Sequence, residues 1–338
     1  MRGSAAADSA APSADTADNP SRDVARDLDP VIVSDAIFDD PGYSPLDLYT
    51  NSHAPDASSD ITFETASGTA LEGTPAVPVV ASCPHAGRSY PASMLAAAQE
   101  PASALRGLED FGVDCLLPGL AQAGITTLIN RLARAYIDVN RDTDAVDASM
   151  FTGDVSTRPA NHLVRAGYGL IPRLTATRKP IYAEKLPAAE LQKRLRNVHT
   201  PYHTALTSLL DSTQTYFGEV LLVDMHSMPA FDRLNNRLAD IICGDGFGMT
   251  LDRDTASAIT GFFKERGLSI TWNHPYAGGY ITRAYGKAGS PRQAVQIEIN
   301  RGLYMDGPAR LDQARVAEVR DLFGAFGRFL AHYRTGAP

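Results

Sequence analysis

Three polar side chains stand at the ends or in the middle of apolar runs that the sequence marks as buried strands. His85 follows AVPVVASC, His226 ends GEVLLVDMH, and Glu298 interrupts QAVQIEI. Open α/β sheets bind ligands at the carboxyl ends of their strands, so these groups could meet at one edge. Zinc binds two imidazoles and a carboxylate and leaves one position open, while a separate glutamate takes the proton of the attacking water. These residue types fit a metallohydrolase, although unrelated core and capping residues would leave the same pattern.

The run before His226 also predicts how its polar side chains are oriented. The stretch VLLV is apolar without alternation, which is typical of a strand buried on both faces of a parallel sheet. Asp224 and His226 are two residues apart, so an extended chain points them to the same side. Pro229 then takes the chain out of the sheet. A lone histidine at this place would more often cap a loop than bind a ligand.

Composition limits the class of protein. The chain has 338 residues, 44% of them hydrophobic, which is enough for one large α/β domain or two ordinary ones. A net charge of -8 without any basic run argues against nucleic acid or an anionic membrane surface as a partner. Three cysteines in apolar stretches favour reduced thiols, and the polar start lacks a signal-peptide hydrophobic region. We therefore expect a cytoplasmic protein that acts on a small molecule.

The chain divides into a leader and a domain. Residues 1–59 are rich in Ala, Asp, Ser and Pro, and such a segment buries too little apolar surface to offset its ordering entropy. We predict a partly disordered leader over residues 1–59 and a single catalytic domain over residues 60–338.

The segment after His85 carries three acids. Residues 105–122 predict a helix whose opening holds Glu109, Asp110 and Asp114, and a strand follows at residues 125–129. Acids in the first turn of a helix also serve as caps, so their presence alone does not indicate a site.

A second apolar run, residues 135–139, predicts an extended segment that ends at Asn140 and Arg141. Residues 143–179 are rich in Gly, Pro and Thr and show no sustained period. Long irregular segments inside a compact domain usually cover a site or bind something.

Apolar residues at spacings of three and four predict a helix over residues 191–209 that packs on the sheet. His199 and His203 lie one turn apart on this helix, which is the spacing of a metal pair. No glutamate follows His199 and Pro201 disturbs the turn, so zinc binding by this pair is the weaker interpretation, and a place for His203 near the substrate stays open.

Seven segments together resemble one family of enzymes. SCPHAGRSYP, EDFGVD, YIDVNRD, PYH, VDMHSMP, NHPYAGGY and QIEINRGLYMD occur in the order found in N-formylglutamate amidohydrolases, over residues 80–306. That family resembles, more distantly, the zinc carboxypeptidases and succinylglutamate desuccinylase. The resemblance implies a single α/β domain of zinc-exopeptidase type with a mostly parallel or mixed sheet flanked by helices. It also implies cleavage of N-formyl-L-glutamate, or another N-acyl amino acid, in amino-acid metabolism such as histidine degradation.

By this resemblance, His85 and His226 bind one zinc ion and Glu298 is the general base. The carboxypeptidase pattern has a ligand glutamate three residues after the first histidine, where this chain has Arg88. The carboxylate ligand must therefore come from elsewhere. We choose Asp110, with Glu109 and Asp114 as the alternatives.

The resemblance also implies residues that hold the substrate. Asn140 and Arg141 resemble the Asn-Arg pair that binds the substrate carboxylate in carboxypeptidases, and Ser227 and His203 are expected beside the substrate. Arg88 is expected to stabilise the oxyanion, although the roles of the two arginines could be reversed. An ordinary surface ion pair of Arg141 with an acid such as Asp142 is the alternative.

Two rival functions stay open at this stage. Cys83 is two residues from His85 and could be a nucleophile, but a thiol inside an apolar strand is more often inert. The chain could also be a binding protein that kept the fold and lost turnover.

Overall fold

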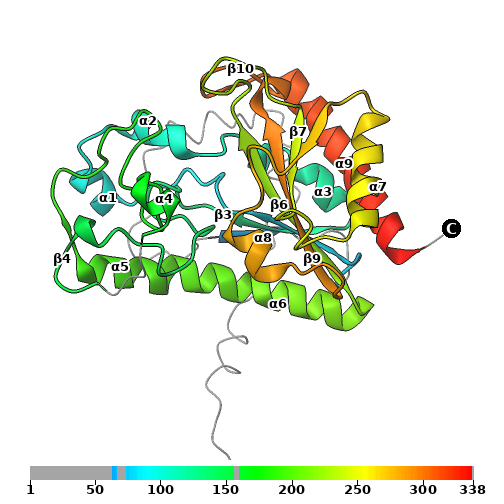
Figure 1. Cartoon of the computed structure of the whole chain (residues 1–338), viewed down its shortest axis with the longest axis horizontal. Coiled ribbons are helices and arrows are strands. Elements are labelled where there is room, and N and C mark those ends of the chain that lie inside the picture. The colour runs from blue at the N-terminus through cyan, green and yellow to red at the C-terminus, as the bar shows by residue number, and fades with distance from the viewer. Residues whose placement is uncertain (1–62, 67–73, 156–159, 337–338) are drawn as a thin grey trace, which may run out of the picture. The chain divides into compact units, whose positions relative to one another are not determined.

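A mixed seven-stranded sheet forms the centre of the computed structural model, which describes residues 63–66, 74–155 and 160–336. The strand order is β1-β3-β2-β6-β9-β7-β8 (Figure 1). The strands are β1 (Phe63–Ala66), β2 (Val79–Cys83), β3 (Thr126–Asn130), β6 (Val220–Met228), β7 (Ile241–Gly244), β8 (Ile270–Trp272) and β9 (Arg292–Asn300). Strands β3, β2, β6 and β9 pair in parallel, whereas β1 and β7 are antiparallel to β3 and β9. The predicted mixed sheet in a single α/β domain is confirmed.

The strand β6 lies in the middle of the sheet and all nine of its residues are buried. Its side chains alternate between two hydrophobic cores, with Leu222 in one core and Val223 in the other. Helix α6 (Thr200–Phe217) covers the first face. Helices α3 (Pro118–Gln122), α7 (Arg253–Lys264) and α9 (Gln313–Thr335) cover the second, as Figure 1 shows. Because both faces are covered, β6 needs no polar face, which explains its unbroken apolar sequence.

The helix predicted over residues 191–209 is confirmed and is longer than expected. It comprises α5 (Ala188–Arg194), a π-helical turn (Leu195–His199) and α6. Its apolar stripe is buried against the sheet and the neighbouring loops, with Leu191, Val198, Tyr202 and Leu206 in the core. The π-helical turn lies where the two histidines are placed, and such turns often occur at functional sites.

The continuous helix predicted over residues 105–122 is wrong. The segment forms α2 (Ala102–Leu105), short 3₁₀ turns at Arg106–Leu108 and Val113–Cys115, and α3. Gly112 breaks the helix because its φ of 78° is left-handed, and a Cβ there would lie 2.6 Å from Leu311 Cδ2. The break leaves Asp110 in an irregular stretch. The backbone N–H of Asp110 donates to the His85 carbonyl at 2.9 Å.

The strand predicted at residues 135–139 does not form. These residues follow the end of β3 as turns, and their apolar side chains pack into the core beside α5 and α6. Much of the segment 143–179 is irregular, as predicted, apart from a 3₁₀ turn (Ala148–Met150), β4 (Phe151–Thr152) and α4 (His162–Arg165).

The remaining short elements complete the description. They are α1 (Ala92–Ala97), β5 (Leu186–Pro187), α8 (Tyr280–Tyr285), a 3₁₀ turn (Arg301–Leu303), β10 (Met305–Gly307) and β11 (Arg310–Leu311). No helix within the described ranges is both long and apolar enough to cross a membrane. The predicted leader, residues 1–59, lies outside the described residues, so its boundary with the domain stays a prediction.

Candidate metal centre

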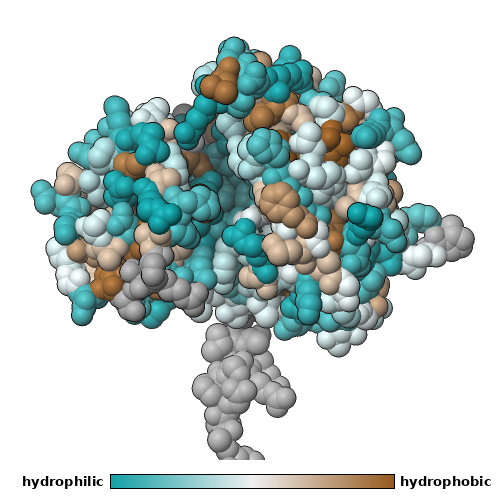
Figure 2. Space-filling model, viewed as in Figure 1, coloured by the Kyte–Doolittle hydropathy of each residue, from teal (hydrophilic) through white to brown (hydrophobic). Residues whose placement is uncertain are grey.

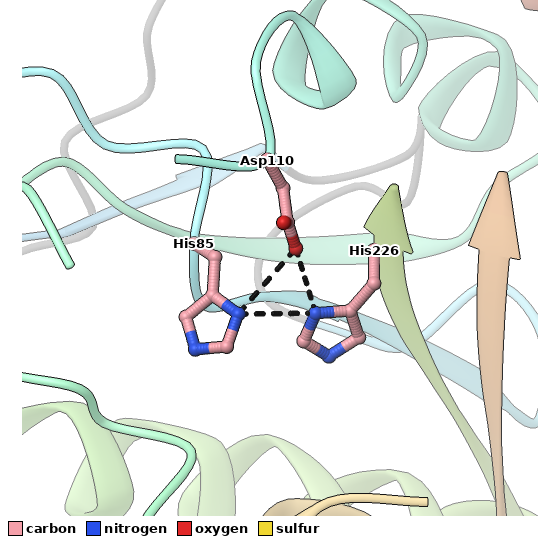
Figure 3. A group of neighbouring side chains, drawn as sticks. All are labelled: His85, Asp110 and His226. Atoms are coloured by element: carbon pink, nitrogen blue, oxygen red, sulfur yellow. Dashed lines mark hydrogen bonds and ion pairs between the residues drawn. The ribbon is translucent and has the colours of Figure 1, made fainter. Parts of the chain in front are cut away.

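His85, Asp110 and His226 converge at the carboxyl edge of the sheet (Figure 3). The Nδ1 atoms of the two imidazoles are 3.1 Å apart. Asp110 Oδ2 lies 2.8 Å from His226 Nδ1 and 3.4 Å from His85 Nδ1. All three residues are buried. His85 follows β2 directly and His226 lies near the end of β6, and these two strands are parallel neighbours, so the sheet itself brings the imidazoles together.

The outer nitrogen of each imidazole is bound to a second carboxylate. His85 Nε2 is 2.7 Å from Asp138 Oδ1, and His226 Nε2 is 3.0 Å from Asp224 Oδ2. When each Nε2–H donates to its carboxylate, both Nδ1 lone pairs point at Asp110. Three acceptors facing one another repel unless a cation or a proton lies between them. Two imidazole nitrogens and one carboxylate oxygen are the donor set of a catalytic zinc site, so these residues fit a divalent metal.

The electrostatics of the metal-free chain agree with this geometry. Burial raises the pKa of Asp110, but hydrogen bonds from His226 and His85 hold that pKa well below its usual range. Burial lowers the pKa of His226, but the charge of Asp224 and the hydrogen bond to Asp110 hold it well above its usual value. The three side chains therefore stabilise a positive charge in the space between them. A bound metal ion would take the place of the proton there.

Asp110 is the one of the three predicted acids that reaches the imidazoles. Glu109 is fully buried and accepts a hydrogen bond from Tyr90. Asp114 accepts instead from Arg88 and Arg131. Asp110 lies between the two 3₁₀ turns, and its backbone bond to the His85 carbonyl holds it beside the imidazoles.

Glu298 lies next to His226 but outside the group of His85, Asp110 and His226, called the triad below. The two residues are register partners on β9 and β6, which pair in parallel over nine residues, so their side chains leave the sheet on the same face. Glu298 Oε1 accepts from Gln296 Nε2 at 2.8 Å. Burial raises the pKa of Glu298 to about 7, against the charges of His226, Arg134 and Arg301, which lower it. A carboxyl group with this pKa can both accept and return a proton near neutral pH.

Three arginines contact these carboxylates, a fourth lies on the neighbouring helix α8, and Arg88 is not among them. Arg134 Nε donates to Asp138 Oδ2 at 2.9 Å, and Arg141 Nη2 lies 3.4 Å from the same oxygen. Arg301 Nη2 lies 3.5 Å from Asp110 Oδ1. The fourth, Arg283, is on α8. Arg88 binds Asp114 instead.

Asp138 and Arg134 were missed in the sequence, although Asp138 lies within the YIDVNRD segment. The polar residue inside that apolar run was the available signal for Asp138. Arg134 offered none, because it reaches the site through turns that periodicity does not predict.

Asn140 is placed differently from the expectation that it touches substrate. Its side chain is buried, its Nδ2 lies 3.4 Å from Asp224 Oδ2, and its Oδ1 accepts from the Ile281 N–H at 2.8 Å. Gly279 packs so closely on the Asn140 amide that any Cβ would overlap it. These contacts make Asn140 a residue that positions Asp224 and α8.

Ser227 points away from the triad, since it follows His226 on a strand, and its Oγ accepts from Arg301 Nε at 3.0 Å. The substrate contacts predicted for Ser227 and Asn140 stay predictions, and their contacts within the chain favour positioning roles.

His199 and His203 bind the loop that carries Arg141 rather than a metal. His199 Nε2 lies 2.9 Å from the Arg141 carbonyl oxygen and His203 Nε2 lies 2.8 Å from that of Val139. His203 Nδ1 is 2.8 Å from Tyr285 Oη. Both ring nitrogens of His203 are thus engaged. Burial lowers the pKa of His203 to about 4, so this imidazole is neutral at pH 7.

The thiol of Cys83 is fully buried on β2, and burial raises its pKa well above the usual value. A nucleophilic cysteine needs an accessible thiolate, so the burial and the raised pKa of Cys83 argue against this role.

Figure 2 shows a hollow lined mainly by hydrophilic residues between the part that holds α1, α2 and α4 and the part that holds β6, β9 and α8.

The family model and the curated relatives that match this sequence all describe the same enzyme. Residues 77–305 match the family model described as N-formylglutamate amidohydrolase. An N-formylglutamate deformylase of Pseudomonas aeruginosa is 30% identical over 257 residues, which cover 73% of this chain and 91% of that protein. A second N-formylglutamate deformylase, from Pseudomonas putida, is 29% identical over 68% of this chain and 82% of its own length.

Solved structures agree with the sequence matches. The crystal structure of an N-formylglutamate amidohydrolase from Ralstonia eutropha JMP134 aligns with a TM-score of 0.75 and 32% identity, over 82% of this chain and 99% of that chain. A gene product of Agrobacterium tumefaciens aligns with a TM-score of 0.58 over 82% of this chain and 95% of its own. At 18% identity this second likeness concerns the fold alone.

Proposed function

The chain belongs to the N-formylglutamate amidohydrolase family, hydrolases of carbon–nitrogen amide bonds, and we propose that it cleaves N-formyl-L-glutamate to formate and L-glutamate at the His85, Asp110 and His226 centre. The observation that carries the proposal is the position of Glu298. A proton acceptor with a pKa of about 7 lies beside a donor set suited to a metal, at the edge of the sheet where substrates bind.

We propose zinc as the metal because the donor set is two neutral imidazoles and one carboxylate. Zinc, when bound, polarises the substrate carbonyl and lowers the pKa of a water ligand to about 7. The chain supplies the supports for this site. Asp138 and Asp224 hold the imidazoles by their Nε2 atoms, which fixes their orientation and raises their basicity toward the metal.

Glu298 accepts a proton from the attacking water and then gives it to the nitrogen of the departing glutamate. Its pKa near neutrality suits both transfers. Gln296 holds one carboxylate oxygen of Glu298, so the other oxygen is the one that exchanges the proton. The burial of Glu298 strengthens its interactions with neighbouring charges, since water screens them poorly there.

The arginines take the two remaining tasks. The oxyanion role predicted for Arg88 goes to Arg134, because Arg134 contacts the carboxylate behind His85 while Arg88 binds Asp114. Arg141 binds a substrate carboxylate, as predicted from its position next to Asn140. Tyr168 and Asn140 each accept a hydrogen bond from its guanidinium through their backbone carbonyls, which fixes the plane of the fork.

A cytoplasmic location, as expected for an enzyme of amino-acid metabolism such as histidine degradation, is part of the proposal. It is supported by the three free thiols at Cys83, Cys115 and Cys243.

A screen of acyl groups and amino acids tests the function. The full chain, loaded with zinc, is incubated with the N-formyl, N-acetyl and N-succinyl forms of L-glutamate, and free amine is measured. We expect N-formyl-L-glutamate to give the highest kcat/KM. A clear preference for the N-acetyl or N-succinyl form would contradict the proposed acyl group, and no amine from any substrate would contradict the enzyme assignment.

A further inference from the structure

Asp138, the acid that pairs with Arg141, also contacts two other groups. Asp138 accepts from Arg134 and ion-pairs with Arg141 through Oδ2, while its Oδ1 contacts His85 Nε2. Two guanidinium groups and one imidazole therefore depend on a single buried carboxylate. This side of the site carries an excess of positive charge.

The short helix α8 brings another guanidinium to the same side. α8 packs on the loop that carries Arg141, because the Ile281 N–H donates to Asn140 Oδ1 at 2.8 Å and Gly279 lies directly against the Asn140 amide. Arg283 is on this helix, and its Nη1 donates to the Gly278 carbonyl at 2.5 Å. That hydrogen bond turns the Arg283 side chain back toward the start of α8, where the helix meets Asn140.

Arg141 and Arg283 are close enough to repel each other. Burial lowers the pKa of Arg141, and the positive charges of Arg134 and Arg283 lower it further, against the raising effect of Asp138. Within the described ranges Arg283 forms no ion pair with a carboxylate, and it is exposed. Two guanidinium groups held near each other without enough acids are stabilised when an anion binds between or beside them.

The charges of the whole site fit a dianion. The site holds the guanidinium groups of Arg134, Arg141 and Arg301, with Arg283 near Arg141, and the carboxyl groups of Asp110, Asp138, Asp224 and Glu298. With all acids ionised these charges cancel. A divalent cation then leaves two positive charges, which equals in magnitude the charge of a substrate with two carboxylates.

We propose that Arg283 is the residue that selects for an acidic side chain: it binds the side-chain carboxylate of the substrate while Arg141 binds the α-carboxylate. The inference rests on the proposed hydrolysis of an N-formyl amino acid. It goes beyond that function by naming the residue on α8 that distinguishes a dicarboxylate from its neutral analogue.

A cycle of one substitution and one substrate change tests it. The wild-type enzyme and Arg283→Met are assayed with N-formyl-L-glutamate and with N-formyl-L-glutamine, which has the same shape without the charge. Because a hydrogen bond to a charged group contributes about 1.5 to 3 kcal/mol, we expect Arg283→Met to lower kcat/KM for the glutamate substrate about 10- to 100-fold, mainly through KM. The value for the glutamine substrate should change less than about threefold, and Arg283→Lys should recover part of the selectivity.

Arg310→Met is the matched control, since Arg310 is exposed and its Nε lies 2.6 Å from Asp306 Oδ1 on the surface of the domain. Equal losses on both substrates in Arg283→Met would overturn the inference and leave the proposed function intact. Calorimetry measures the binding of L-glutamate and L-glutamine to zinc-loaded protein. Because it needs no turnover, it tests the role of Arg283 separately from the proposed hydrolysis. Unchanged affinity of Arg283→Met for L-glutamate would contradict the role of Arg283 whatever the activity.

Discussion

His226 and Glu298 are register partners on the parallel strands β6 and β9, so an imidazole of the candidate metal centre and the carboxyl group of Glu298 leave the sheet side by side on one face. Their relative position is set by nine consecutive paired residues rather than by a loop. A slip of one residue in this register would turn Glu298 to the opposite core. The sheet therefore fixes the position of Glu298, the proposed proton acceptor, relative to the candidate metal centre.

Glu298→Gln separates proton transfer from metal binding. The amide keeps the shape and the contact with Gln296 and cannot accept a proton, so we expect kcat to fall roughly 10²- to 10⁴-fold. Zinc content, measured by elemental analysis, should stay at the wild-type level because Glu298 is outside the triad. Loss of zinc in this variant would make Glu298 a ligand, and near wild-type turnover in folded, metal-loaded protein would remove it from the mechanism.

Arg134 and Arg88 have different roles, and matched substitutions distinguish them. Arg134→Met removes a group next to the triad, so we expect kcat to fall roughly 10²- to 10³-fold with little loss of zinc. Arg88→Met leaves the buried Asp114 with fewer partners and should lower the free energy of unfolding by about 1 to 3 kcal/mol.

The folded Arg88→Met enzyme should keep kcat within a few-fold of the wild type. A large loss of kcat in Arg88→Met, with none in Arg134→Met, would return the oxyanion role to Arg88. Urea unfolding curves and steady-state kinetics on the same preparations provide both readings.

His203 makes stability depend on pH. Its pKa in the folded chain is about 4 and that of an unfolded histidine is about 6.5, so the unfolded state binds the proton first as pH falls. The contribution of neutral His203 is complete above pH 6.5 and is lost between about pH 6.5 and 4. At about 1.4 kcal/mol per pKa unit, the difference between about 6.5 and about 4 amounts to roughly 3.5 kcal/mol at most.

His203→Gln removes the titration and keeps an N–H that can reach the Val139 carbonyl. We expect the drop in unfolding free energy between pH 6.5 and 4 to be smaller in this variant than in the wild type. His332→Gln, at an exposed position on α9, is the control and should behave as the wild type. Identical pH profiles for wild type and His203→Gln would show that burial does not lower the pKa of His203.

The sequence was sufficient to find the groups that strands position. His85, His226 and Glu298 stand out because each follows or interrupts a local apolar run, and local periodicity predicts where such runs end. Asp110 required more, since the chain is not helical there: Gly112 has a left-handed φ of 78°, and the Asp110 N–H donates to the His85 carbonyl, a contact that local periodicity does not predict. The predicted helix failed for that reason, even though the chosen acid is the one that meets the imidazoles.

The positions of the arginines could not be predicted from local sequence patterns. Arg134 lies on a turn that is held by its bond to Asp138, and Arg283 lies on the short helix α8, which packs against Asn140. Neither residue stands next to a periodic pattern. Asn140 was identified from the family resemblance, but its hydrogen bond to the Ile281 N–H of α8 had no signal in the sequence, and its predicted substrate contact stays a prediction.

The central claim is that one divalent metal at His85, Asp110 and His226 is required for amide hydrolysis, and a zinc titration tests it most directly. Metal-free protein is titrated with zinc while formate released from N-formyl-L-glutamate is measured, alongside Asp110→Asn as a variant of the same shape. The account predicts that wild-type activity rises from near zero and reaches its plateau at one zinc per chain, and that Asp110→Asn needs far more zinc. Full activity in the metal-free protein, or the same titration curve for both proteins, would contradict it.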